Sequence, residues 1–86
     1  MSITKAAIGE KVRTYVLQEY YDGESSELTD DLPLVSSGLI DSISILQMVE
    51  FLEQSFNFEF LPHEVDEENL NSIQQIVEFV STKQAA

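Results

Sequence analysis

The residues whose types could most readily take part in chemistry are Asp41 and Ser42, an acid and a hydroxyl that follow a glycine of a predicted turn. The surrounding stretch has the sequence GLIDSI over residues 38–43, and the longest helical pattern of the chain follows it directly. Asp is a favourable N-cap residue, so the pattern places Ser42 at the first helical position with its hydroxyl pointing outward. Helix N-termini present unsatisfied amides and a partial positive charge, which favour a phosphate. The site therefore suits a covalently attached phosphodiester.

Other reactive groups are few, and they do not converge on a catalytic set. The chain has no cysteine, which excludes disulfides, thiolate metal sites and cysteine nucleophiles, so any thiol would have to be imported. The one histidine, His63, lies in an acidic connector, where a surface position is favoured over a role as catalytic base. The acidic run over residues 66–71 lacks the glycine and the ligand spacing of an EF-hand loop. We therefore expect no catalytic residue and no metal site.

Composition and charge limit the class of protein further. The 86 residues suffice for one domain over residues 1–86, and a hydrophobic content of 43% is too high for a disordered acidic tail. The net charge of −12 disfavours nucleic acid as a partner and favours proteins with basic patches, although it does not by itself distinguish partner binding from simple solubility. No apolar run is long enough for a membrane span, and the first residues lack an apolar signal core. These features predict a soluble cytoplasmic protein, which we expect to be a monomer.

Hydrophobic periodicity predicts an all-α fold: a small four-helix bundle with three main helices, one short helix and a long first loop. The helices are expected over residues 4–20, 41–56, 62–68 and 71–83. Asn57 is predicted to end the second helix, and Asn71 with Gln74 is predicted to form the capping box of the last one. The apolar residues expected to anchor the long loop in the core are Leu28, Leu32, Leu34 and Val35.

The second helix is predicted to carry apolar side chains on two faces. Its core stripe is expected to consist of Ile45, Met48, Val49, Leu52 and Phe56. Ile43 and Leu46 lie off that stripe, on the flank that also carries Ser42, Glu50 and Glu53. Two spare apolar side chains beside an exposed hydroxyl indicate either a docking patch for a partner or a surface covered by a neighbouring loop, and periodicity leaves both open.

With these features the chain resembles the acyl carrier and peptidyl (aminoacyl) carrier protein family, of the freestanding type. The resemblance covers nearly the whole chain and rests on GLIDSI, the helix after it, the long first loop and the two helices that follow. It implies that Ser42 carries a 4′-phosphopantetheine arm, transferred from coenzyme A by a phosphopantetheinyl transferase, with Asp41 as the helix cap beside the site. It also implies that Ile43, Leu46, Glu50 and Glu53 face partner enzymes. A member of this family is not an enzyme; it holds an acyl or aminoacyl group as a thioester and shuttles it between pathway enzymes.

The helix after Ser42 is less acidic than in the fatty-acid members of that family, since Glu50 and Glu53 are its only acids. Together with FNFEF at residues 56–60 and ENLNSI at residues 68–73, this looks more like carriers that a dedicated acyl- or amino-acid-activating ligase loads for downstream transferases. The resemblance thus implies a specialised role, in amino acid or secondary metabolism, rather than general fatty-acid synthesis. The alternative is an acidic helical protein–protein interaction module without a prosthetic group, in which Ser42 is a cap residue.

Overall fold

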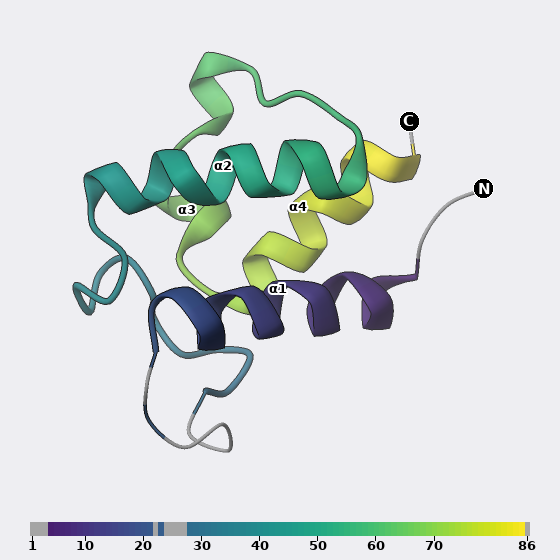
Figure 1. The fold of residues 1–86 in the computed structure, drawn as a ribbon. Helices are drawn as coiled ribbons and strands as arrows, with labels where there is room; N and C mark the ends of the chain where they lie inside the picture. The colour runs from purple at the N-terminus through teal and green to yellow at the C-terminus, as the bar shows by residue number, and fades with distance from the viewer. Residues whose placement is uncertain (1–3, 22, 24–27, 86) are drawn as a thin grey trace.

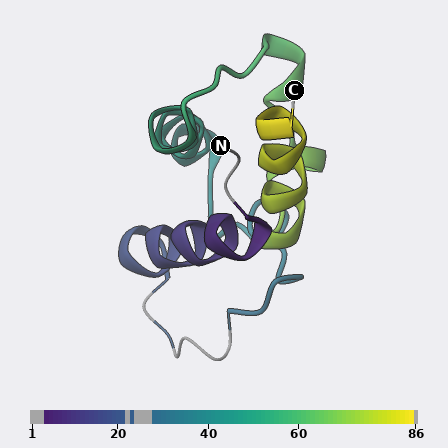
Figure 2. The same ribbon diagram turned by 90° about the vertical axis from the view of Figure 1, so that its right-hand side faces the viewer.

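Helices are the only regular elements in the part of the chain that the structure describes. The structure is a computed structural model that describes residues 4–21, 23 and 28–85, without the side chains of residues 84 and 85. Its elements are α1 (Lys5–Glu19), α2 (Ser42–Phe56), the 3-10 turn η2 (Pro62–Glu64), α3 (Glu67–Leu70) and α4 (Ile73–Ala85). Figures 1 and 2 show α4 crossing one side of the α1–α2 pair, with α3 beside it. The predicted all-α fold with three main helices is confirmed.

Helix α1 follows its predicted amphipathic pattern. Thr4 caps the helix, because its hydroxyl accepts a hydrogen bond of 3.2 Å from the amide of Ala7. The face toward the core consists of Ile8, Val12 and Val16, which are all fully buried. Gly9 lies where α1 meets α4, since a Cβ added there would be 3.4 Å from Cγ2 of Val77. The backbone of α1 therefore approaches α4 closely at Gly9, where a Cβ would make an ordinary van der Waals contact.

Helix α2 begins and ends where the sequence predicts. Asp41 is its N-cap, and Asn57 ends it in the left-handed conformation with φ 56°. Of the predicted core stripe, Met48, Leu52 and Phe56 are buried, while Ile45 and Val49 are half-buried against the same core. One edge of α2 also contacts α1 through an aromatic pair: the rings of Phe51 and Tyr15 stack with centroids 3.8 Å apart.

The single short helix predicted over residues 62–68 is wrong in its form. The segment divides into η2 and α3 because Asp66 adopts an extended conformation and caps a new helix. Its Oδ1 accepts a hydrogen bond of 3.1 Å from the amide of Asn69. The phenylalanines of the preceding connector, Phe58 and Phe60, pack against the core. The ring centroids of Phe60 and Phe79 on α4 lie 4.9 Å apart, and Phe58 packs beside Phe60 at 5.2 Å.

The predicted capping box of the last helix is wrong by one residue. Ser72, not Asn71, caps α4: its hydroxyl accepts a hydrogen bond of 3.1 Å from the amide of Gln75 and lies 3.3 Å from the side-chain oxygen of the same residue. The amide of Gln74 instead donates to the carbonyl of Asp30, at 2.9 Å. Helix α4 therefore starts at Ile73 and extends to Ala85, two residues beyond the predicted end.

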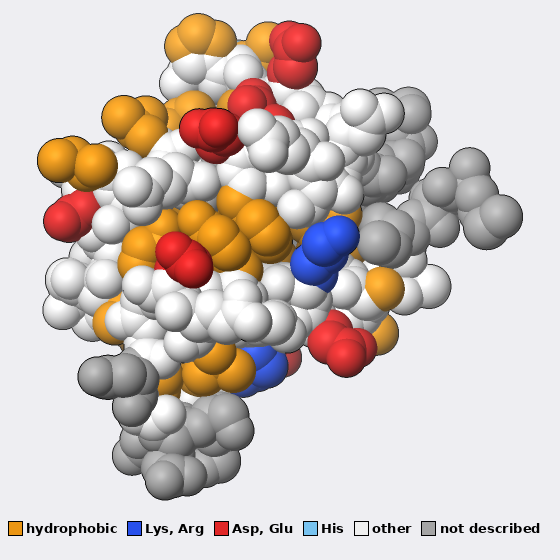
Figure 3. Space-filling view, viewed as in Figure 1, with side chains coloured by type: hydrophobic (Ala, Val, Ile, Leu, Met, Phe, Trp, Pro, Cys, Tyr) orange, Lys and Arg blue, Asp and Glu red, His pale blue; other side chains and the backbone are white. Residues whose placement is uncertain are grey.

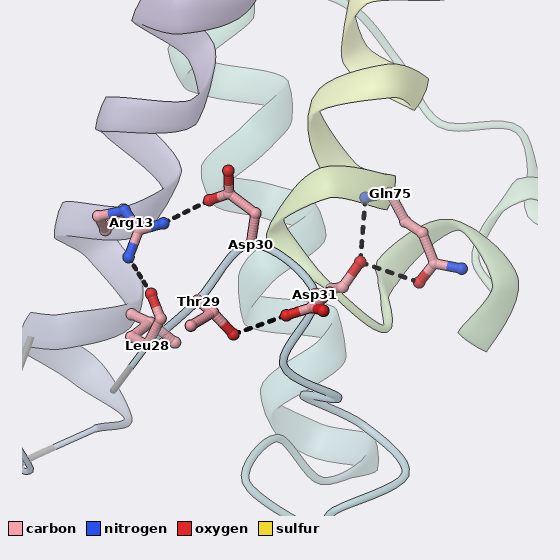
Figure 4. Close-up of polar contacts among 7 residues, drawn as sticks. Arg13, Leu28, Thr29, Asp30, Asp31 and Gln75 are labelled. Carbon is pink, nitrogen blue, oxygen red and sulfur yellow. Dashed lines mark hydrogen bonds and ion pairs between the residues drawn. The ribbon is translucent and has the colours of Figure 1, made fainter. Parts of the chain in front are cut away.

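The long first loop is anchored by both apolar and polar contacts. Its predicted apolar anchors reach the protein interior to different extents: Leu28 and Leu34 are buried, whereas Leu32 and Val35 are half-buried. Arg13 on α1 donates hydrogen bonds to the carbonyl of Leu28 and to the carboxylate of Asp30 (Figure 4). The described part of the loop is thereby held against α1, while residues 22 and 24–27 lie outside the described residues.

Candidate functional site

The first turn of α2 presents Ser42 to solvent. Asp41 has an extended backbone, its Oδ1 accepts a hydrogen bond of 2.8 Å from the amide of Ser44, and its carbonyl accepts one of 2.9 Å from the amide of Ile45. Ser42 is therefore the first helical residue, and it is exposed. The predicted cap and the predicted position of the serine are both confirmed. A hydroxyl in this position is accessible to a modifying enzyme.

The electrostatics of this turn follow from the cap. The hydrogen bond from the Ser44 amide holds the pKa of Asp41 below its ordinary value of 3.8. Asp41 is consequently a carboxylate at neutral pH and satisfies one of the free amides of the helix start. This carboxylate beside the exposed hydroxyl can contact a metal ion or a basic group.

The chain immediately before Asp41 is fixed by a buried residue and a turn. Ile40 is buried, and its amide donates to the carbonyl of Leu34 at 2.9 Å. Gly38 has φ +86°, and its amide donates to the carbonyl of Val35 at 3.0 Å. A φ of +86° is strained for most residues that have a Cβ and favours glycine, which explains the glycine at this turn. Ser42 is thus held between an anchored isoleucine and the packed body of α2.

Two large apolar side chains are exposed beside Ser42. Ile43 is 70% exposed and Leu46 is 64% exposed, and Figure 3 shows apolar side chains projecting near the N-terminal end of α2. The alternative in which a loop covers this pair is wrong for the residues that the structure describes. Leu61, next to η2, is 49% exposed and forms a third such side chain. The exposure of Leu61 could not be predicted from the sequence, because an irregular connector has no periodicity that separates inward from outward residues.

The two glutamates predicted for the partner face have different surroundings. Glu50 is exposed and accepts a hydrogen bond of 3.3 Å from the side-chain amide of Gln54. Glu53 is half-buried, and its Oε2 accepts a hydrogen bond of 2.8 Å from the backbone amide of Phe60. Glu53 therefore stabilises the connector after α2, a role that sequence analysis did not anticipate. Its contact with Phe60 leaves Glu50 as the more accessible charge on this helix.

Tyr20 joins the end of α1 to the first turns of α2. Its hydroxyl lies 3.4 Å from the carbonyl of Ser44, 3.3 Å from Oε1 of Gln47 and 3.2 Å from the hydroxyl of Tyr15. Burial raises the pKa of the Tyr20 hydroxyl above its ordinary value, so it stays protonated as a donor. From the sequence, Tyr20 could be placed only at the end of a helix, because contacts between distant segments leave no local pattern.

The described residues give no sign of a second reactive centre. Within them, no group of three or more His, Cys, Asp or Glu side chains is arranged to hold a metal ion. His63 is exposed in η2. No helix among these residues has the length and apolar character needed to cross a membrane.

Comparison with known proteins decides the family. The chain is 33% identical over 79 residues to an acyl carrier protein of Guillardia theta, an alignment that covers 92% of this chain and 94% of that protein. The chain belongs to the acyl carrier protein family. It is also 27% identical over 75 residues to the probable acyl carrier protein PigG of Serratia sp. (strain ATCC 39006), covering 87% of this chain and 86% of PigG. No protein-family model matches the chain. As an acyl carrier protein, the chain is a carrier and not an enzyme.

Proposed function

We propose that this acyl carrier protein holds its cargo on a 4′-phosphopantetheine arm attached to Ser42. The observation that carries the proposal is the exposed hydroxyl of Ser42 at the first position of α2, directly after the capping carboxylate of Asp41. A serine in this position is open to a phosphopantetheinyl transferase, and the neighbouring carboxylate of Asp41 would contact the metal ion or basic residues of that enzyme.

The surroundings of Ser42 fit such a group. The hydroxyl is exposed, and the nearby helix start favours a phosphate by its partial positive charge. The chain has no cysteine, so the arm would supply a thiol that the protein itself lacks. That thiol binds an acyl or aminoacyl group as a thioester, which the carrier shuttles between pathway enzymes.

Partner enzymes are proposed to dock on Ile43, Leu46 and Glu50, beside the attachment site. Exposed apolar side chains with a charge at their edge mark a site of protein–protein interaction. Three of the four basic side chains form ion pairs within the protein: Lys5 with Glu78, Arg13 with Asp30 and Lys83 with Glu64. The remaining surface is therefore strongly acidic, which favours partners with basic patches. We also propose that the protein is a cytoplasmic monomer that meets several enzymes in turn.

The composition of α2 supports a specialised role, in amino acid or secondary metabolism, over general fatty-acid synthesis. Only Glu50 and Glu53 are acidic in this helix, and Glu53 is engaged by Phe60. Docking would then depend more on the shape of the apolar pair than on a row of charges, as expected for a dedicated acyl- or amino-acid-activating ligase. The thioester released from the protein purified from its own cells would identify the cargo; a long-chain fatty acyl group would contradict the specialised role.

Attachment is tested by incubating the protein with coenzyme A and a broad-specificity phosphopantetheinyl transferase, followed by intact-mass measurement. We expect one phosphopantetheine increment on the wild-type chain and none on Ser42→Ala. Ser44→Ala is the matched control, since it removes a hydroxyl two positions along the same helix and should take up the arm. An increment that survives Ser42→Ala would show that the arm is attached elsewhere.

A further inference from the structure

Asn71, between α3 and α4, binds three consecutive residues of the long loop. Its Oδ1 accepts hydrogen bonds from the amide of Val35 at 2.9 Å and from the amide of Ser36 at 3.0 Å. Its Nδ2 donates to the hydroxyl of Ser36 at 3.3 Å, and its backbone carbonyl accepts from the amide of Leu34. One residue, 35 positions away in the sequence from Ser36, therefore fixes the loop segment over residues 34–36.

The clamped segment is also the base of the turn that leads to Ser42. Leu34 is buried, and its carbonyl accepts the hydrogen bond from the amide of Ile40. The carbonyl of Val35 accepts the hydrogen bond from Gly38. Ile40 lies two residues before Ser42, and these hydrogen bonds fix its position relative to the residues that Asn71 binds.

We propose that Asn71 is a positioning residue for the modification of Ser42. The inference rests on the proposed attachment at Ser42. The side-chain oxygen of Asn71 accepts hydrogen bonds from two adjacent backbone amides and so keeps the turn over residues 34–40 in one conformation. An incoming transferase then meets the turn and Ser42 in a fixed relative position. A turn with more conformational freedom would have to become ordered on binding, and this entropy cost weakens recognition without changing the chemical step.

The side chain of Asn71 is separable from the core. The residue is half-buried and is not part of the apolar cluster, so Asn71→Ala removes hydrogen bonds without opening a core cavity. The backbone bond from Leu34 remains in every variant. Asn71→Asp keeps the acceptor for Val35 and Ser36 and loses only the donor to the Ser36 hydroxyl. This variant therefore tests whether the acceptor oxygen is the group that matters.

Asn69, two residues before Asn71 and within α3, offers a matched control. Its side-chain amide donates to the carbonyl of Glu64 at 3.0 Å, within the connector and away from the loop. Asn69→Ala removes a comparable side-chain hydrogen bond from α3 and should leave the loop clamp intact. A general loosening of α3 would affect both variants, whereas loss of the clamp affects Asn71→Ala alone.

The test measures steady-state transfer from coenzyme A by one phosphopantetheinyl transferase, with each carrier variant as the varied substrate. The loss of all three side-chain hydrogen bonds to the loop is expected to raise KM for Asn71→Ala about threefold to tenfold, with kcat within about twofold of wild type. Asn71→Asp and Asn69→Ala should keep the wild-type KM. Hydrogen exchange at the amides of Val35 and Ser36 should accelerate in Asn71→Ala and stay slow in the other two variants.

A wild-type KM for Asn71→Ala would overturn the proposal, as would an equal rise in KM for Asn69→Ala or a failure of Asn71→Asp to restore it. These results differ from a failure of the proposed function, in which the wild-type chain itself would accept no phosphopantetheine. In that case an unchanged rate of hydrogen exchange at the amides of Val35 and Ser36 in Asn71→Ala would still show that Asn71 does not fix the loop segment over residues 34–36.

Discussion

Two leucines of α2, Leu52 and Leu46, should respond very differently to truncation. Leu52 is 0% exposed in the core, whereas Leu46 is 64% exposed beside Ser42. Leu52→Ala deletes three buried carbons, worth about 2.4 kcal/mol at ~0.8 kcal/mol for each, and leaves a cavity behind. We therefore expect a loss of about 3 kcal/mol in the free energy of unfolding, which lowers Tm by roughly 12–24 °C in a domain of this size.

Leu46→Ala removes the same carbons from a side chain that has only about a third of its surface buried. The corresponding loss is below about 1 kcal/mol, and the higher helix propensity of alanine offsets a few tenths of it. Tm should fall by less than about 5 °C. The functional effect is the reverse, because Leu46 belongs to the proposed docking face and Leu52 does not.

Both variants are measured by urea unfolding, followed by circular dichroism, with a common m-value. Loading by a partner enzyme is then measured at a temperature where both variants are folded. Leu46→Ala should load more slowly than Leu52→Ala. Equal destabilisation of the two variants would refute the division of α2 into a core face and an exposed face.

Three further perturbations test the turn and the helix start. Gly38→Ala should lower the free energy of unfolding, measured in urea, by about 1–2 kcal/mol, because a positive φ is unfavourable for a residue with a Cβ even though no atom lies within 4 Å of the added Cβ. An unchanged free energy of unfolding would contradict this reason for the glycine. The Asp41 carboxylate has a lowered pKa, so its stabilisation is complete above the unfolded pKa of 3.8 and is lost as pH falls through the lower folded value. The stability difference between wild type and Asp41→Asn should therefore be constant near neutrality and change only below about pH 4. Ile43→Asp should slow phosphopantetheine transfer at an unchanged Tm; a large fall in Tm would show that Ile43 is a core residue.

The boundaries of α2 could be predicted because they depend on neighbouring residues. Asp41 bonds an amide three positions away, and Asn57 adopts its left-handed conformation locally. The core stripe follows equally directly from helical periodicity. Exposure of Ile43 and Leu46 could not be decided in this way, because it depends on where the long loop runs.

The cap of α4 shows where local patterns become ambiguous. Asn71 with Gln74 and Ser72 with Gln75 both have the spacing of a capping box. The choice between them is made by the long loop, whose amides engage the side chain of Asn71 and leave Ser72 to cap the helix. Glu53 is a similar case: a glutamate on a helix flank looks solvent-exposed until the connector returns and places the amide of Phe60 against it.

The most direct test of the central claim is the intact mass of the protein purified from its own cells, with tandem mass spectrometry of the peptide that contains Ser42. We predict a mass increased by one 4′-phosphopantetheine, located on Ser42. An unmodified chain, or one with a simple phosphate on Ser42, would contradict the account and favour an acidic interaction module without a prosthetic group.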